Sequence, residues 1–161
     1  MFTDMTLHTA LEDPAQPEIL ALLKAGEEHS AQLYPAESNH HVALDGLRVS
    51  NVRFFVTRDD GRAVATGALV LHGSWGELKR MWVVPGARGS GVSKAILAKL
   101  EAAALNEHVN VLRLETGVQN HAALGLYRRA GFVQRGPFGE YRHDPLSVFM
   151  EKELRGSPNS H

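Results

Sequence analysis

The segment 77–100 has the residue types and the spacing of an anion-binding site. A predicted strand ends at Val84, a turn at Pro85 and Gly86 leads into a loop with Gly89 and Gly91, and a helical pattern begins at about Val92. The first N–H groups of a helix have no intrahelical partner, and the helix dipole adds positive charge there. Glycines let a backbone approach a phosphate closely, so we expect this loop to hold a diphosphate.

Charged residues beside this loop fit a diphosphate, whereas two common nucleotide loops do not fit. Arg88 and Lys94 supply positive charge next to the glycines. A Walker A loop needs Lys directly after its last Gly, where this chain has Val92. A dinucleotide-binding loop needs a third Gly at the position of Lys94. The sequence therefore disfavours both nucleotide classes.

The loop resembles the acetyl-CoA loop of the GNAT superfamily of N-acetyltransferases, whose pattern is Gln/Arg-x-x-Gly-x-Gly/Ala. In this chain the pattern begins at Arg88, has its required Gly at Gly91 and ends at Ser93, where the superfamily usually has Gly or Ala. The stretch from Leu112 to Thr116 and the stretch from Asn120 to Phe132 resemble the superfamily's next strand and helix, and the second ends in its Tyr-x-x-x-Gly-Phe signature. The ordered similarity extends from about residue 64 to residue 154, which is more than half of the chain.

The resemblance implies acetyl-CoA as the cofactor and a set of residues that contact it. These residues are Met81, Trp82, Val83, Arg88, Gly89, Ser90, Gly91, Val92, Ser93, Lys94, Asn120 and Tyr127. In the superfamily the two central strands splay apart and the pantetheine arm pairs with the backbone between them. Backbone N–H groups at 82–84 are expected to polarise the thioester carbonyl. Arg128 and Arg129 are candidates for the 3′-phosphate, with solvated surface cations as the alternative.

Acetyl transfer to an amine needs a base for the amine and a proton for the departing thiolate. Tyr127 resembles the superfamily's general acid, and Glu77 lies six residues before Val83, the offset at which histone-modifying members carry their general base. The structural alternatives are a half-buried Tyr at a helix end and an exposed, ion-paired Glu on a strand. Asn120 is expected to cap its helix, to contact the pantetheine arm, or to do both.

The amine acceptor is expected between an early polar loop and a late turn. The candidate residues are Tyr34, Glu37, Asn39 and His41 in the loop, and Glu140 and Tyr141 in the turn. Loops on a rigid scaffold often carry recognition residues, although a solvated connector is an equal alternative for the early loop. Acidic residues there would favour a cationic amine, while Arg48, Arg53 or Arg142 would select an amino-acid carboxylate. The sequence does not choose between these acceptors.

The elements that position these residues follow from hydrophobic periodicity and turn residues. Strands are predicted at about 5–10, 52–57, 63–71, 77–84, 109–115, 132–135 and 147–152, and helices at about 16–34, 92–105 and 120–130. The first helix is expected to turn Ile19, Leu20, Leu22 and Leu23 inward. The predicted fold is α/β (α+β), with a mixed, mostly antiparallel central sheet of about seven strands and helices on both faces. The resemblance adds splayed central strands.

Composition limits the class of protein. The chain has 161 residues, a net charge of −1 and no Cys. These values suit one domain, disfavour nucleic acid as a partner, and exclude a disulfide scaffold, a thiolate metal site and a Cys nucleophile. His40 and His41 have no i,i+4 partner, so no metal site is expected. No apolar run approaches the roughly 20 residues of a membrane span, which favours a cytoplasmic protein with no membrane partner.

These observations predict a single acetyltransferase domain at 1–154 and a disordered tail at 155–161. The expected function is acetyl-CoA-dependent N-acetylation of a small-molecule amine or amino acid, by a monomer or a homodimer. A protein lysine or N-terminal acetyltransferase stays open as an alternative that differs in its acceptor. A non-catalytic acyl-CoA-binding sensor is another alternative, although it would have no use for an acid and a base at Tyr127 and Glu77.

Overall fold

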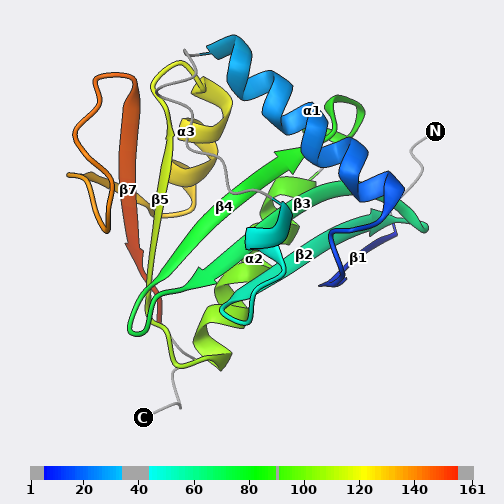
Figure 1. Cartoon of the computed structure of the whole chain (residues 1–161), viewed down its shortest axis with the longest axis horizontal. Helices are drawn as coiled ribbons and strands as arrows, with labels where there is room; N and C mark the ends of the chain where they lie inside the picture. Colours follow the sequence, from blue (N-terminus) through cyan, green and yellow to red (C-terminus); the bar gives the residue numbers. More distant parts are fainter. Residues whose placement is uncertain (1–5, 34–43, 90, 156–161) are drawn as a thin grey trace.

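The structure of the protein is a computed structural model that describes residues 6–33, 44–89 and 91–155. Its elements in chain order are β1 (Leu7–Leu11), α1 (Pro17–Leu33), η2 (Leu44–Leu47), β2 (Val52–Asp59), β3 (Arg62–Leu71), β4 (Gly76–Val83), η3 (Pro85–Ala87), α2 (Val92–Asn106), β5 (Val111–Gly117), α3 (His121–Arg129), β6 (Val133–Arg135) and β7 (Ser147–Glu153). The strands form one seven-stranded sheet in the order β1-β2-β3-β4-β5-β7-β6 (Figure 1). Neighbouring strands are antiparallel except β4 and β5, which are parallel. The predicted mixed, mostly antiparallel sheet is confirmed.

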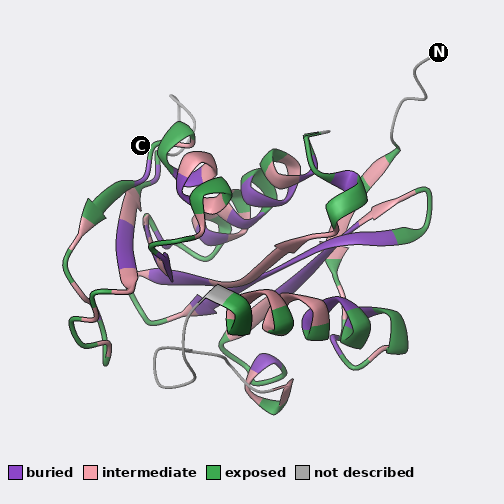
Figure 2. Cartoon of the chain, turned by 90° about the horizontal axis from the view of Figure 1, so that it is seen from above, coloured by how far each residue is buried: buried purple, intermediate pink, exposed green. Residues whose placement is uncertain are grey.

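Helices cover both faces of this sheet, as predicted (Figure 2). On one face, α1 packs Ile19, Leu22 and Leu23 against a cluster that includes Phe54 and Val56 of β2. On the other face, α2 and α3 form a larger cluster with inward-facing residues of β3, β4, β5 and β7. The sheet therefore separates two hydrophobic clusters.

The helix boundaries follow the predicted signals, with one error in the side chains that face inward. Leu20 is 41% exposed, whereas Ile19, Leu22 and Leu23 are buried. Positions i, i+3 and i+4 share one stripe of a helix, and Leu20 lies one residue off that stripe. The prediction that Leu20 faces the core is wrong for this reason. Among the described residues, no helix has both the length and the apolar composition to cross a membrane.

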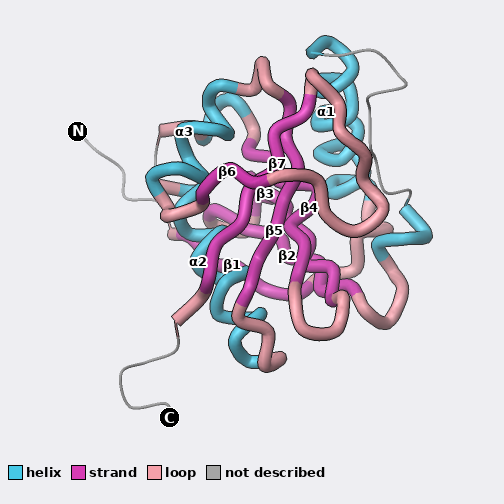
Figure 3. Tube along the Cα trace, turned by 90° about the vertical axis from the view of Figure 1, so that its left-hand side faces the viewer, coloured by secondary structure: helices cyan, strands magenta, loops and turns pink. Residues whose placement is uncertain are grey.

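The two central strands pair over a short distance and then separate. Parallel pairing of β4 with β5 is limited to three residue pairs, from Gly76–Leu112 to Leu78–Leu114. Beyond these pairs β4 remains bonded to β3, and β5 remains bonded to β7. Figure 1 shows the strands diverging toward the end of the sheet where α1 and α3 lie, and Figure 3 shows the sheet from the side of β6 and β7. The splayed central strands are thus present, and we call the space between them the fork.

A β-bulge distorts β4 where the fork begins. Lys79 and Trp82 pair with residues that are two apart on β3, so Arg80 and Met81 both lie opposite a single residue. Arg80 has a φ of 56°, in the left-handed region that non-Gly residues seldom adopt. Thr66 Oγ1 donates to the Arg80 carbonyl oxygen at 2.8 Å and so stabilises this geometry. The bulge shifts the alternation of β4 side chains by one residue at the fork.

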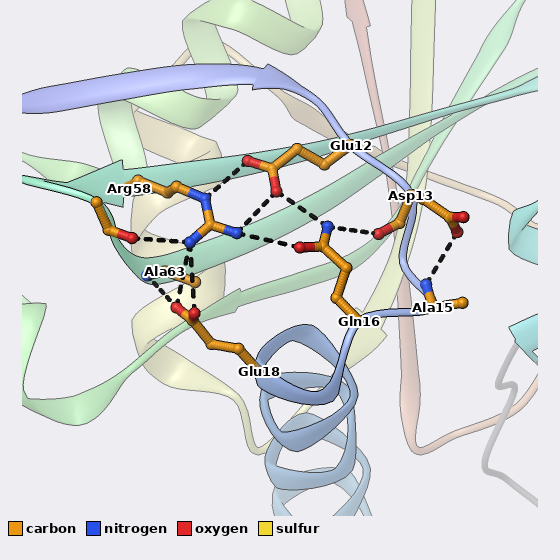
Figure 4. A network of polar contacts seen from close by, with 8 residues as sticks. Glu12, Asp13, Ala15, Gln16, Glu18, Arg58 and Ala63 are labelled. Atoms are coloured by element: carbon orange, nitrogen blue, oxygen red, sulfur yellow. Dashed lines mark hydrogen bonds and ion pairs between the residues drawn. The ribbon is translucent and has the colours of Figure 1, made fainter.

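An ion-pair network fixes the start of α1 to the first strands of the sheet (Figure 4). Arg58 on β2 donates to Glu12 at 2.8 and 2.9 Å and to Glu18 at 3.3 Å. Gln16 donates to Glu12 at 3.1 Å, and Glu18 accepts from the Ala63 N–H at 2.6 Å. These contacts join β1, α1, β2 and β3 at one corner of the molecule and so help set where α1 crosses the sheet.

Candidate active site

A cleft with a volume of about 130 Å³ lies in the fork. It is lined by Leu22, Leu23, Gly26 and Ser30 of α1, Thr66 of β3, Leu78, Lys79, Arg80, Met81 and Trp82 of β4, Leu114, Glu115 and Thr116 of β5, Asn120, Ala123 and Tyr127 of the α3 region, and Tyr141. The structure thus brings together five of the predicted site residues, which are Met81, Trp82, Asn120, Tyr127 and Tyr141.

Tyr127 is buried in the wall of this cleft. The residue is 4% exposed, and its ring packs edge-on against Phe132 with centroids 5.5 Å apart. Within the described part of the chain, its hydroxyl has no hydrogen-bond partner. Burial raises the pKa of Tyr127 because the phenolate would be poorly solvated there. The phenol is therefore protonated at neutral pH, and its O–H can donate to a group that enters the cleft.

The loop before α2 leaves backbone N–H groups open to a ligand. Gly91 is the N-cap with a φ of 86°, and no side chain in the described ranges caps the helix. The first intrahelical bond runs from the Ala95 N–H to the Gly91 carbonyl oxygen at 3.0 Å, so the three N–H groups before Ala95 lack a helical partner. A Cβ on Gly89 or Gly91 would meet no atom within 4 Å. The loop is an open cradle of the kind that binds phosphate groups.

Arg88 is held at the edge of this loop by its neighbours on β4. Its guanidinium lies 4.9 Å from the Trp82 ring centroid, and its Nε donates to the Val83 carbonyl oxygen at 3.2 Å. The His29 ring also contacts Trp82, with ring centroids 5.2 Å apart. Burial, and then the charge of Arg88, lower the pKa of His29, so this imidazole is neutral at pH 7. Arg88 is therefore pre-positioned beside the cradle, and none of the acidic side chains that the structure describes forms an ion pair with it.

The other predicted cofactor residues have varied surroundings. Lys94 is exposed on the first turn of α2, Val92 is buried and Ser93 is half-buried. Ser90 lies outside the described residues. The candidates for the 3′-phosphate, Arg128 and Arg129, are exposed in the last turn of α3 and are absent from the cleft lining.

The backbone of β4 directs the N–H of Val83 toward the fork. Val84 donates its N–H to the Val64 carbonyl oxygen at 2.9 Å. Successive N–H groups of a strand point to opposite edges, so the Val83 N–H points away from β3. That edge faces β5 after the two strands have separated. Of the N–H groups predicted to polarise the carbonyl, the one of Val84 is used within the sheet and the one of Val83 is directed to the fork.

Asn120 caps α3, as predicted. Its Oδ1 accepts from the Ala123 N–H at 3.4 Å, and its Nδ2 lies 3.5 Å from Thr116 Oγ1. The side chain also lines the cleft. The cap is therefore observed, while a contact with the pantetheine arm stays a prediction.

Glu77, the predicted base, lies behind the cleft wall. It is 4% exposed and is absent from the cleft lining. Its carboxylate accepts a hydrogen bond from Tyr141 Oη at 2.6 Å and lies 3.1 Å from His72 Nε2 and 3.4 Å from Lys79 Nζ. Glu77 belongs to the part of β4 that is still paired with β5, before the fork opens. A proton that Glu77 exchanges with the cleft must therefore pass through a neighbouring group.

Much of the predicted acceptor site lies outside the described residues. This holds for Tyr34, Glu37, Asn39 and His41. In the late turn, Tyr141 lines the cleft, whereas Glu140 is exposed and is absent from the lining.

The arginines predicted to select a carboxylate are not in the cleft lining. Arg48 pairs with Asp13 at 3.1 Å, and Arg53 pairs with Glu107 at 3.1 Å. Arg142 is exposed in the late turn. These cations have local partners or face solvent, so the cleft takes its positive charge from elsewhere.

Lys79 and Arg80 are the cations of the cleft lining, and sequence reasoning missed both. Lys79 is two residues after Glu77, so strand alternation puts the two side chains on one face; that signal was available. Arg80 pairs with Glu27 of α1 at 2.7 Å, and its side chain is 8% exposed. Arg80 points into this region because of the bulge, which has no periodic signature in the sequence. The lining residues that α1 contributes were also missed, because hydrophobic periodicity does not predict the position and angle at which a helix packs on a sheet.

Comparison with known proteins assigns the family. Residues 16–132 match the Acetyltransferase (GNAT) family. An IAA acetyltransferase of Azospirillum brasilense is 43% identical over 147 residues, which cover 90% of this chain and 96% of that protein. A solved protein of Klebsiella pneumoniae described as an acyl-CoA N-acyltransferase is 36% identical, with a TM-score of 0.79 over 93% of this chain and 99% of that chain.

A more distant solved structure has the same fold. The PaiA N-acetyltransferase of Thermoplasma acidophilum, solved in complex with coenzyme A, superposes with a TM-score of 0.74 at 15% identity, over 93% of this chain and 100% of that chain. The architecture, the cleft and these relatives agree, and the chain belongs to the GNAT family of N-acetyltransferases.

Proposed function

We propose that this protein transfers the acetyl group of acetyl-CoA to the amine of a small molecule by direct attack of the amine on the thioester. The observation that carries this proposal is the fork between β4 and β5. The protonated phenol of Tyr127 lines it, and the backbone N–H of Val83 is directed toward it. Acyl transfer needs a proton donor for the leaving thiolate and a polar donor for the carbonyl oxygen. The fork supplies both kinds of group.

The residues of the chain fit coenzyme A. The open cradle at Gly89 and Gly91, with Arg88 and Lys94 beside it, suits a diphosphate. The free edge of β4 suits an extended arm with amide groups, which binds to a strand edge as a peptide does. Coenzyme A in PaiA, a protein of the same fold, supports this assignment.

The proposed chemistry uses few groups of the protein. Bound acetyl-CoA supplies the thioester whose carbonyl carbon the amine attacks. The Val83 N–H would donate to the carbonyl oxygen as that oxygen gains negative charge. Tyr127 would donate its O–H to the departing sulfur. Burial raises the pKa of Tyr127, so the phenol is protonated at neutral pH and has this proton to offer.

The dimensions of the cleft favour a small acceptor. The cleft is bounded on one side by α1, which narrows the space that a peptide chain would need. The 43% sequence identity to an IAA acetyltransferase supports a small-molecule acceptor as well. The protein-acceptor alternative has no comparable support from the described residues.

The charges of the cleft favour an acceptor that carries a carboxylate in addition to its amine. Lys79 and Arg80 both line the cleft, and cations at a half-buried site attract an anionic ligand. The planar guanidinium of Arg80 also matches a carboxylate in shape. Glu27, which pairs with Arg80, is itself 46% exposed, so solvent screens that pair and a substrate carboxylate can compete for the guanidinium.

The test combines calorimetry with an acceptor screen. Acetyl-CoA is titrated into the protein, and a panel of amino acids is then compared with matched amines that lack the carboxylate, using release of free thiol as the readout. The proposal predicts heat with acetyl-CoA and faster thiol release with the carboxylate-bearing amines. No heat with acetyl-CoA would contradict the cofactor assignment. Binding without thiol release from any amine would support the sensor alternative, and faster acetylation of a lysine peptide would support the protein-acceptor alternative.

A further inference from the structure

Four polar side chains form a hydrogen-bonded chain from the cleft to the surface. Lys79 Nζ donates to Tyr141 Oη at 2.6 Å, and Tyr141 Oη donates to Glu77 Oε2 at 2.6 Å. The other carboxylate oxygen of Glu77 lies 3.1 Å from His72 Nε2. Lys79 and Tyr141 line the cleft, Glu77 is buried, and the His72 side chain is 35% exposed. This series of hydrogen bonds therefore connects the cleft, at Lys79 and Tyr141, with the partly solvent-exposed side chain of His72.

The cross-strand neighbours of Glu77 do not compete for its carboxylate. Its neighbour across the sheet on β3 is apolar, and its neighbour on β5, Arg113, donates to Glu151 at 2.8 Å. Among the described residues, the charged groups in contact with the Glu77 carboxylate are Lys79, 3.4 Å away, and His72 when it is protonated. Glu77 therefore exchanges protons through Tyr141 on the cleft side and through His72 on the solvent side.

Aromatic contacts position the rings of Tyr141 and His72, and these contacts do not use the Tyr141 hydroxyl or the ring nitrogens of His72. Tyr141 packs edge-on against Phe138 and Phe149, with centroids 5.0 and 5.5 Å apart. His72 stacks on Trp75 with centroids 4.2 Å apart and an interplanar angle of 16°. Packing of this kind fixes a ring even when its polar atoms are removed. A Phe at position 141 would keep these contacts, so the hydroxyl can be tested separately from the packing.

We infer that Tyr141, Glu77 and His72 carry away the proton that the acceptor amine loses before or during its attack. This inference rests on the proposed function, because an alkylamine is mostly an ammonium ion at pH 7 and has no lone pair for attack. The acceptor N–H donates to Tyr141 Oη, and its proton moves to that oxygen as the phenolic proton moves to Glu77. The protonated carboxyl group of Glu77 then turns so that its O–H faces His72 Nε2. In its Nδ1–H tautomer, His72 accepts this proton at Nε2 and releases the one on Nδ1 to solvent.

The transfer balances, since one proton leaves the acceptor and one enters solvent. Tyr141 and Glu77 return to their starting states, and His72 returns when its ring protons exchange with water. Tyr141 is the catalytic residue of this pathway because it touches the acceptor, while Glu77 and His72 act through it. Lys79 is a positioning residue, whose ammonium stabilises negative charge on Tyr141 Oη during the transfer. The pathway gives Glu77 a part in catalysis from behind the cleft wall.

The first test is Tyr141→Phe across a range of pH. At pH 7 we expect kcat to fall about 10²-fold, the usual size of a lost acid–base contribution. The deficit should narrow as the pH approaches the pKa of the acceptor, about 10 for an alkylamine, because water then supplies the neutral amine. The affinity for acetyl-CoA and the melting temperature should stay close to those of the wild type, since the ring contacts remain.

The second test is His72→Gln, with buffer rescue as the readout. The variant should lose turnover at low buffer concentration and regain it when imidazole is added, because a soluble base can replace the missing outlet. His8→Gln, on the edge strand β1, is the matched control, and imidazole should leave its rate unchanged.

Two results would overturn the inference while leaving the proposed function intact. One is a Tyr141→Phe deficit that is the same at every pH, and the other is a His72→Gln deficit that imidazole does not restore. Either result would assign these residues to structure alone. Absence of turnover by the wild type with every amine would instead overturn the proposed function, and the inference with it.

Discussion

The cleft contains two tyrosine hydroxyls in opposite electrostatic surroundings. Tyr127 sits among apolar groups, and burial raises its pKa, so its hydroxyl acts as a donor. Tyr141 lies between a cation and an anion, Lys79 and Glu77, and its hydroxyl both accepts and donates. The first setting keeps the phenol protonated, with its O–H directed to whatever enters the cleft, and the second suits transfer of a proton from one hydrogen-bonded group to the next.

Replacement of Tyr127 by Phe tests the acid. The change removes one hydroxyl and keeps the ring contact with Phe132, so the fold should be unaffected. We expect kcat to fall about 10²-fold with little change in acetyl-CoA affinity, measured by thiol release and by calorimetry. This deficit should not narrow at high pH, because the leaving thiolate needs its proton whatever the state of the amine. Turnover equal to that of the wild type would remove Tyr127 from this role.

Replacement of Arg80 by Gln tests the selection of a carboxylate. Loss of a charged contact with a bound anion costs about 1.5–3 kcal/mol, so KM for carboxylate-bearing acceptors should rise by about tenfold or more. KM for amines without a carboxylate should change little. Arg48→Gln is the control, since Arg48 pairs with Asp13 outside the cleft lining. An equal rise in KM for both acceptor classes would indicate that Arg80 serves only to position α1 through Glu27.

Sequence reasoning found some residues of the site and missed others for physical reasons. Tyr127 and Asn120 lie on one short helix whose cap and signature are local in sequence. The offset of Glu77 from Val83 predicts a base, but its hydrogen-bond partner Tyr141 is 64 residues away in the sequence, in an irregular turn that folds back onto β4. A contact between residues so far apart in the sequence leaves no periodic pattern, so it cannot be predicted from a single sequence.

The segment β4–loop–α2 is the element on which the cofactor assignment depends. Its glycines serve two purposes, since Gly91 adopts a φ of 86° and leaves space where a Cβ would lie. The boundaries of β4, α2 and β5 agree with prediction to within about two residues, because strand runs, a glycine loop and helix periodicity are local signals. The fork and the bulge are differences in pairing between strands, and a single-sequence pattern does not record pairing.

Gly91→Ala tests this element. A left-handed backbone costs a residue with a Cβ about 1–2 kcal/mol, so we expect a lower melting temperature and weaker binding of acetyl-CoA. Gly86→Ala is a matched control in the same loop, since Gly86 lacks a left-handed φ and a Cβ there would also meet no atom within 4 Å. Calorimetry and thermal unfolding measure both effects. An affinity for acetyl-CoA that is unchanged in the Gly91 variant would show that the diphosphate binds elsewhere.

At the scale of the whole molecule, the Arg58 network links stability to pH. The hydrogen bond from Arg58 lowers the pKa of Glu12 below its ordinary value. A carboxyl group whose folded-state pKa is lowered stabilises the fold above its unfolded-state pKa, about 4.3, and this contribution is lost as the pH falls through the folded-state value. The protein should therefore lose stability in acid partly through this corner, where α1 joins the sheet.

Glu12→Gln tests this link. At pH 7 the variant should be less stable by about 1–3 kcal/mol, because it weakens charged hydrogen bonds to Arg58. The difference from the wild type should begin to shrink below the unfolded-state pKa of about 4.3 and should be lost once the pH falls below the lowered folded-state pKa, where Glu12 is protonated in both states. Glu28→Gln, an exposed change on α1, is the control. Denaturant unfolding at several pH values gives these free energies, and a difference that did not depend on pH would assign the effect to something other than ionisation.

The separation of the two hydrophobic clusters by the sheet has a consequence for how such an enzyme can diversify. The α1 cluster backs one wall of the cleft, while the α2 and α3 cluster supports Tyr127 and the start of α2. Changes at Leu22, Leu23 or Ser30 can therefore reshape the space for a new acceptor without repacking the cluster that supports Tyr127 and α2. Gly26 is left out because a side chain there would contact Trp82, over which Arg88 lies. A library confined to the other three positions is a direct route to altered substrate choice.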